Sequence, residues 1–134
     1  MMRRVAVVGA GHVGLVTSAC LAELGNSVAC VDSNVPRIEA LQCGQPPFYE
    51  PGLSELIWKN RIAGRLIFHV DIGAAVQSAE FIFIAVGTPI RDDGTCDLSA
   101  VRSAARDIAQ HLTNDAIVVN KSTVPVETGD LVAA

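Results

Sequence analysis

Residues 5–14 of this chain read Val5-Ala6-Val7-Val8-Gly9-Ala10-Gly11-His12-Val13-Gly14. The first four are small or β-branched apolar residues, which is typical of a buried strand, and the last six fit the pattern G-x-G-x-x-G. A strand, a glycine-rich turn and a helix in this order predict the first unit of a doubly wound α/β domain, with a dinucleotide site at the turn. The helix is indicated by apolar residues that recur at helical spacing, namely Val13, Val16, Cys20, Leu21 and Leu24.

The three glycines of this turn have separate expected roles. Gly9 permits the tight turn, Gly11 lets a diphosphate approach the backbone without a Cβ in the way, and Gly14 lets the helix pack close to the strands. The amino terminus of the helix supplies free N–H donors and about half a positive charge, so no basic side chain is needed to hold the anion. We assign no catalysis to His12, which is expected at the surface or beside the cofactor.

Asp32 follows a second predicted strand over residues 27–31. An acidic side chain at this position can accept hydrogen bonds from the ribose hydroxyls of the adenosine half and repels a 2′-phosphate, so NAD is expected rather than NADP. Arg37 could soften this preference by offering a guanidinium near the same ribose. Two simpler interpretations stay open: Asp32 as a turn residue or helix cap, and Arg37 as a solvated helix residue.

Strands and helices alternate along the rest of the chain. Apolar runs predict strands over 66–70, 81–86 and 116–120, and the run over 81–86 lacks polar alternation, as expected for a central strand covered on both faces. The pattern predicts one α/β domain over 1–134, a Rossmann-type doubly wound, mainly parallel sheet of order 3-2-1-4-5 with helices on both faces. Further helices are predicted from Asn34 to Leu41, over 50–58, 71–76 and 97–112, and from Glu127 onward.

Composition and charge narrow the possible partners. The chain is 50% hydrophobic and 18% charged, with a mean hydropathy of +0.38 and a formal net charge of -4. There is no broad positive field for nucleic acid, and no apolar run is long enough to span a membrane. Because the sequence has no targeting segment and no C-x-x-C pair, we expect reduced thiols in a cytoplasmic protein.

Neither the cysteines nor the acidic residues suggest a metal site. Cys20 and Cys30 lie in apolar patterns and are expected to be buried, whereas Cys43 and Cys96 lie in loop-like stretches and could be exposed. The acidic stretch 92–97 lacks the spacing of a calcium loop, so a solvated turn is expected there.

Lys121, Ser122 and Thr123 follow the fifth predicted strand. Because the carboxyl ends of parallel strands border the ligand crevice, their position makes these three residues candidates for the site. A strand-end turn with a helix cap before Pro125 explains them equally well.

Three further motifs accompany the glycine turn. They are Glu50-Pro51-Gly52-Leu53, Phe83-Ile84-Ala85-Val86-Gly87-Thr88-Pro89 and Asn120-Lys121-Ser122-Thr123-Val124-Pro125-Val126. In the order and spacing of these motifs the chain resembles the NAD-binding domain of the nucleotide-sugar 6-dehydrogenases, a family that includes UDP-glucose and GDP-mannose dehydrogenases. The resemblance runs over essentially the whole chain.

The resemblance implies which residues contact the cofactor. Thr123 would in addition help to place a water near the reacting carbon, and Glu50–Leu53 would border the substrate region. The residues implied to touch NAD are Gly9, Ala10, Gly11, His12, Val13, Gly14, Asp32, Arg37, Val86, Gly87, Thr88, Pro89, Ser122, Thr123 and Val124.

The resemblance also implies a reaction. Members of the family oxidise the C6 alcohol of a UDP- or GDP-linked sugar to a carboxylate in two hydride transfers, with two NAD consumed per sugar. A cysteine nucleophile carries the intermediate as a thiohemiacetal and then a thioester, which activated water hydrolyses. That cysteine lies in a G-x-C-x-P-K-D segment far downstream, which this chain lacks, and Cys96 stands in a different context. The chain alone is therefore expected to be inactive.

Two further observations concern residues 127–134. Residues 131–134 continue a helical pattern without a stop signal, so we expect a longer polypeptide. The family resemblance implies that a central helix and a sugar-nucleotide domain would complete the enzyme and form a homodimer. Glu127 stands where many relatives carry glycine, and its carboxylate could favour a helix amino terminus but would repel a nearby phosphate.

Two alternative functions stay open. One is a free-standing NAD-binding regulatory module, and the other is the NAD domain of another β-hydroxyacid-type dehydrogenase. The stretch 121–126 favours the nucleotide-sugar enzymes over the latter.

Overall fold

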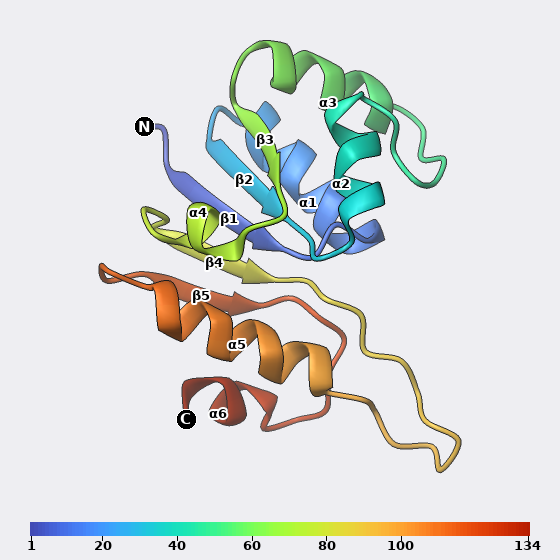
Figure 1. Ribbon diagram of the computed structural model, residues 1–134, viewed down its shortest axis with the longest axis vertical. Coiled ribbons are helices and arrows are strands. Elements are labelled where there is room, and N and C mark those ends of the chain that lie inside the picture. The colour runs from blue at the N-terminus through green and yellow to red at the C-terminus, as the bar shows by residue number, and fades with distance from the viewer.

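Five parallel strands form one sheet in the order β3-β2-β1-β4-β5 (Figure 1). The computed structural model describes all residues from 1 to 134. This order confirms the predicted Rossmann-type sheet. Two strands end earlier than predicted, at His69 instead of Val70 and at Ile84 instead of Val86. The strands are β1 (Arg4–Val8), β2 (Ser27–Val31), β3 (Leu66–His69), β4 (Phe81–Ile84) and β5 (Ile117–Asn120).

The register of the strands brings the candidate residues to one edge of the sheet. Val8 of β1 pairs with Val31 of β2 on one side and with Ile84 of β4 on the other. Because all strands run in the same direction, the residues that follow these three, Gly9, Asp32 and Ala85, leave the sheet side by side.

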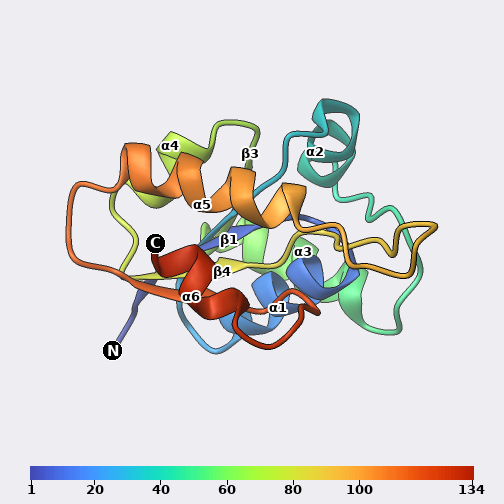
Figure 2. The same cartoon turned by 90° about the horizontal axis from the view of Figure 1, so that it is seen from below.

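Helices cover both faces of the sheet, and alternate strand residues supply a core to each face. Figure 2 shows α4 and α5 together on one side and α1 on the other. Val5 and Val7 belong to the core with α1, whereas Ala6 and Val8 belong to the core with α4 and α5, as the two-residue period of a strand requires. The helices are α1 (His12–Glu23), α2 (Val35–Gln42), α3 (Leu53–Ile62), α4 (Ile72–Val76), α5 (Ser99–His111) and α6 (Thr128–Ala133).

Helix α1 buries a different face from the one that its apolar residues predict. The expected stripe is partly in solvent: Val13 is 46% exposed, Leu24 is 79% exposed, and Cys20, predicted to be buried, is exposed. The buried residues are Gly14, Leu15, Ser18, Ala19 and Ala22. Four of these are small, because α1 begins directly at the glycine turn and packs closely on β1 and β2.

A buried asparagine joins α1 to α3. Asn60 is fully buried, and its amide group donates to Glu23 Oε2 at 2.9 Å and to the Leu56 carbonyl at 2.9 Å. Its side-chain oxygen accepts from Arg65 Nε at 2.9 Å. Every polar atom of this side chain therefore has a partner, as burial requires.

Two predicted helix caps are observed, whereas α3 begins at Leu53 instead of residue 50 and α5 begins at Ser99 instead of residue 97. Asn34 caps α2 by accepting from the Arg37 amide at 3.0 Å, and Asp71 caps α4 by accepting from the Gly73 amide at 2.9 Å. The last helix, predicted from Glu127 onward, is α6, which begins at Thr128 with Glu127 as its N-cap, so the alternative of a helix cap before Pro125 does not hold. None of the helices has the length and apolar character that a membrane crossing requires.

Candidate functional site

A cavity of about 580 Å³ opens at the carboxyl ends of the strands. It extends from the glycine turn, past the end of β2, to the side of α5. The lining includes six residues predicted to contact the cofactor, namely Gly9, Gly11, Asp32, Arg37, Val86 and Gly87. This edge is the position at which ligands bind in open parallel sheets.

The geometry of the turn explains its glycines. Gly9 has a φ of 108°, and a Cβ on it would collide with the carbonyl oxygen of Ala85. A Cβ on Gly14 would collide with the carbonyl oxygen of Gly9, so this residue allows α1 to pack against the turn. Gly11, by contrast, lines the cavity, and a Cβ on it would meet no atom within 4 Å. Gly9 and Gly14 thus build the turn, and Gly11 keeps the space in front of it open.

Backbone amides at the start of α1 are free to hold an anion. The amides of Gly11, His12 and Val13 donate to no acceptor in the chain. They carry the partial positive charge of the helix amino terminus, which favours a phosphate group. The Ala10 amide differs, since it donates to Asp32 Oδ2 at 2.8 Å.

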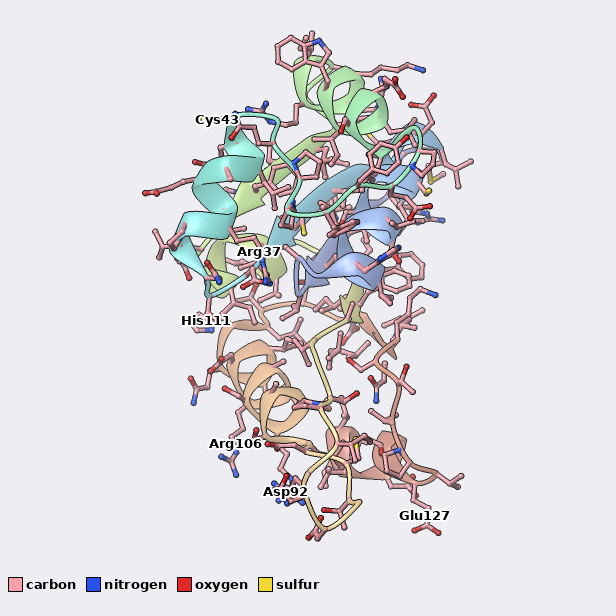
Figure 3. The ribbon with its side chains drawn as sticks, turned by 90° about the vertical axis from the view of Figure 1, so that its right-hand side faces the viewer. Arg37, Cys43, Asp92, Arg106, His111 and Glu127 are labelled. Carbon is pink, nitrogen blue, oxygen red and sulfur yellow. The ribbon has the colours of Figure 1, made fainter.

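Asp32 is fixed at the end of β2 by three contacts. Its Oδ2 accepts from the Ala10 amide and lies 3.2 Å from Arg37 Nη1, and its Oδ1 accepts from the Asn34 amide at 2.8 Å. A carboxylate has about four acceptor positions, so capacity remains for a ribose hydroxyl. Asp32 is not the cap of α2, because Asn34 has that role. Arg37 also lines the cavity, and Figure 3 shows it beside the lower end of α2, above α5.

The loops after β4 and β5 are tied together by hydroxyl groups. Ser122 Oγ donates to the Val86 carbonyl at 2.9 Å, and Thr88 Oγ1 donates to the Thr123 carbonyl at 2.6 Å. These hydroxyls therefore fix the backbone of the two loops relative to each other. The Thr123 side chain is exposed and makes no hydrogen bond within the chain.

With this geometry established, comparison with known proteins identifies the family. Residues 3–134 match the family described as UDP-glucose/GDP-mannose dehydrogenase family, NAD binding domain. The chain belongs to the UDP-glucose/GDP-mannose dehydrogenase family. It is an NAD-binding domain of that family, and NAD is its cofactor.

Curated relatives of this dehydrogenase-family domain are much longer than the chain. It is 48% identical over 131 residues to UDP-glucose 6-dehydrogenase TuaD of Bacillus subtilis, which covers 98% of this chain and 28% of the relative. It is 50% identical over 128 residues to UDP-glucose 6-dehydrogenase of Rhizobium meliloti, covering 95% of this chain and 29% of the relative. The chain thus spans less than a third of the length of these enzymes.

Solved structures agree with this assignment. A ternary complex of GDP-mannose dehydrogenase from Pseudomonas aeruginosa superposes with a TM-score of 0.92 at 34% identity, over 96% of this chain and 30% of that one. A UDP-glucose dehydrogenase from Pyrobaculum islandicum gives a TM-score of 0.92 at 38% identity, over 99% of this chain and 33% of that one.

In this dehydrogenase-family domain the His12 side chain contacts the Phe48–Glu50 segment. Its ring stacks on Phe48, with centroids 4.6 Å apart and planes 7° apart, and its Nε2 lies 3.4 Å from Glu50 Oε2. The structure thereby joins the glycine turn to the start of the 50–53 motif. Sequence reasoning missed Phe48, because a single aromatic residue in a loop carries no periodic signal.

The cysteines and the acidic turn have structural explanations. Burial raises the pKa of the Cys30 thiol to about 12, which makes this thiol unreactive at neutral pH, whereas Cys43 is exposed. Hydrogen bonds from the Thr95 hydroxyl and amide lower the pKa of Asp93, and the Ser99 amide lowers the pKa of Asp97. No group of three or more His, Cys, Asp or Glu side chains is arranged as metal ligands.

Part of the cavity wall lies outside the motifs. Val70 and Ile72, on either side of the start of α4, line the cavity without being singled out by sequence reasoning. The same holds for four residues of α5, Ala100, Ser103, Ala104 and Asp107. Their spacing puts the α5 residues on one helix face, but only the tertiary structure shows what that face borders.

Proposed function

We propose that this chain holds NAD for the oxidation of a nucleotide sugar at C6 to a carboxylate, as in a UDP-glucose 6-dehydrogenase, within a larger protein. The observation that carries the proposal is the glycine turn, where Gly11 faces an open cavity and neighbouring amides are free to donate. The names of the relatives support UDP- or GDP-linked sugars as the substrate class.

Each part of the site has a proposed contact with NAD. The amides of residues 11–13 hold the diphosphate, while Asp32 and Arg37 bind the adenosine ribose. The other proposed contacts come from residues 86–89 after β4 and residues 122–124 after β5, which orient the nicotinamide end. Ala10 contributes through Asp32, because its amide holds that carboxylate in place.

The chain supplies binding and orientation rather than the covalent chemistry. NAD, when bound, accepts the hydride. The nucleophilic cysteine must come from outside these residues, since no G-x-C-x-P-K-D segment occurs in them and Cys30 is buried. Thr123 is proposed to position the water that hydrolyses the acyl intermediate, and its exposed side chain is compatible with that role. A further sugar-nucleotide domain, a homodimer and a cytoplasmic location stay predictions.

Titration calorimetry with NAD and NADP tests the proposal. The wild-type chain should bind NAD more tightly than NADP, and Gly11→Val should abolish binding because its side chain fills the diphosphate position. Gly11 has a φ of -76° and a ψ of -166°, which valine adopts readily, so the variant should fold.

Gly129→Val is the matched control, because Gly129 also has open space around it but lies in α6 and does not line the cavity. It should bind NAD like the wild type. Undiminished binding by Gly11→Val would contradict the proposal, as would steady oxidation of UDP-glucose by the 134-residue chain alone.

A further inference from the structure

The cavity continues beyond Asp32 to the side of α5. Ala100, Ser103, Ala104 and Asp107 line it there, at spacings of three and four residues that bring them to one helix face. The glycine turn, the Asp32–Arg37 pair and the α5 face line the same cavity. The adenosine half of NAD joins a diphosphate, a ribose and a base, and with the turn proposed for the diphosphate and Asp32 and Arg37 for the ribose, the α5 face is the part of the lining that is left for the base.

The α5 end of the cavity offers apolar walls and few polar groups. Val70, Ile72, Ala100 and Ala104 contribute only apolar side-chain atoms, which suit the faces of a flat ring. Ser103 and Asp107 supply the polar side chains of the α5 wall. A carboxylate at neutral pH only accepts hydrogen bonds.

The carboxylate of Asp107 is free to bind a ligand. The carboxylate makes no hydrogen bond or ion pair within the chain. The one hydrogen bond of this residue with another side chain involves its backbone carbonyl, which lies 2.8 Å from His111 Nδ1. The one basic residue of the cavity wall, Arg37, is already paired with Asp32 at 3.2 Å. The side chain is half-buried, so water competes for it only in part.

We propose that Asp107 selects adenine by accepting a hydrogen bond from its exocyclic amino group. This inference rests on the NAD binding proposed above and adds a specificity-determining residue to it. Adenine presents an N–H donor at this position, whereas hypoxanthine and guanine present a carbonyl oxygen. A carboxylate attracts the former and repels the latter, so a base with an oxygen at that position is rejected.

Calorimetry with NAD and nicotinamide hypoxanthine dinucleotide isolates this contact, because the two ligands differ in the base alone. The wild-type chain should bind NAD roughly tenfold more tightly, as expected for one partly exposed hydrogen bond to a charged group. Asp107→Ala should bring the ratio of the two affinities close to one, mainly by weakening the binding of NAD. Asp107→Asn keeps the shape and adds a donor for the hypoxanthine oxygen, so it should reduce the ratio at least as far.

Asp115→Asn is the matched control. It removes the same charge from an exposed position between α5 and β5, outside the cavity lining, and should leave the ratio unchanged. Circular dichroism of each variant verifies folding. Alanine and asparagine at position 107 are both compatible with the surface of a helix.

The outcomes separate this inference from the proposed function. If NAD binds to the wild-type chain and Asp107→Ala leaves the preference for NAD intact, adenine selection by Asp107 is wrong and the NAD site stands. If the wild-type chain binds NAD and nicotinamide hypoxanthine dinucleotide equally tightly, adenine selection by Asp107 is likewise wrong. If the wild-type chain does not bind NAD at all, both proposals are overturned.

Discussion

Glu127 is the single residue other than glycine with a positive φ, 73°, and it precedes α6 as its N-cap. Its carboxylate makes no hydrogen bond or ion pair, and Figure 3 shows the side chain at the outer edge of the domain. A side chain with a Cβ in this left-handed conformation costs roughly 1–2 kcal/mol, which glycine avoids. Glycine in turn loses about 0.5–1 kcal/mol more conformational entropy on folding.

Glu127→Gly should therefore raise the free energy of unfolding by about 0.5–1 kcal/mol. With an unfolding entropy of about 2.1 cal/mol/K per residue, this corresponds to a rise in Tm of roughly 2–4 °C for a domain of this size. Thermal unfolding followed by circular dichroism measures the shift.

Two variants separate the backbone effect from other causes. Val126→Gly introduces glycine at the preceding position, which is 92% exposed and has no positive φ, so it should lower Tm by a similar amount. Glu127→Gln removes the charge without changing the backbone and should shift Tm by less than about 1 °C. If Glu127→Gly lowered Tm as Val126→Gly does, the assignment of strain to Glu127 would be refuted.

Three further predictions address the site and the core. Asp32→Ala should weaken NAD binding about tenfold and improve NADP binding relative to NAD, because the carboxylate both accepts from the ribose and repels a 2′-phosphate; calorimetry that shows an unchanged NAD preference would exclude this role. Asn60→Leu should reduce the free energy of unfolding by about 2–3 kcal/mol in urea titrations, since it leaves buried polar partners unpaired, and a loss below about 0.5 kcal/mol would mean that water replaces the amide. Cys20 and Cys43 should react with a thiol reagent at neutral pH, whereas Cys30, with its pKa raised to about 12, should react only after unfolding; equal rates in the folded protein would show that Cys30 is not protected.

The acidic character of the chain is compatible with its cofactor because the anion site uses backbone groups. The formal net charge is -4, and the amides at the start of α1 donate to no side chain or backbone acceptor. A helix amino terminus holds a diphosphate by N–H groups and dipoles in direct contact with it. Charges elsewhere on the molecule are farther away and screened by salt, so the net charge has little influence on this binding.

The sequence by itself determined the strand order, the glycine turn and the position of Asp32, because these depend on signals within short windows. Buried β-branched runs that alternate with helices allow few sheet topologies, and each glycine of the turn meets a local backbone requirement. The motifs after β4 and β5 were also found from short stretches of sequence, through their resemblance to the family.

Only the tertiary structure decided which faces of the helices are used. The apolar residues of α1 predicted the wrong buried face, because close packing at the turn selects small residues such as Gly14 and Ser18 rather than the most apolar ones. Asp107 on α5, like Phe48 beside His12, contacts the site across long sequence separations. Periodicity states that a helix has a face, but which neighbour covers that face depends on the packing of the whole chain.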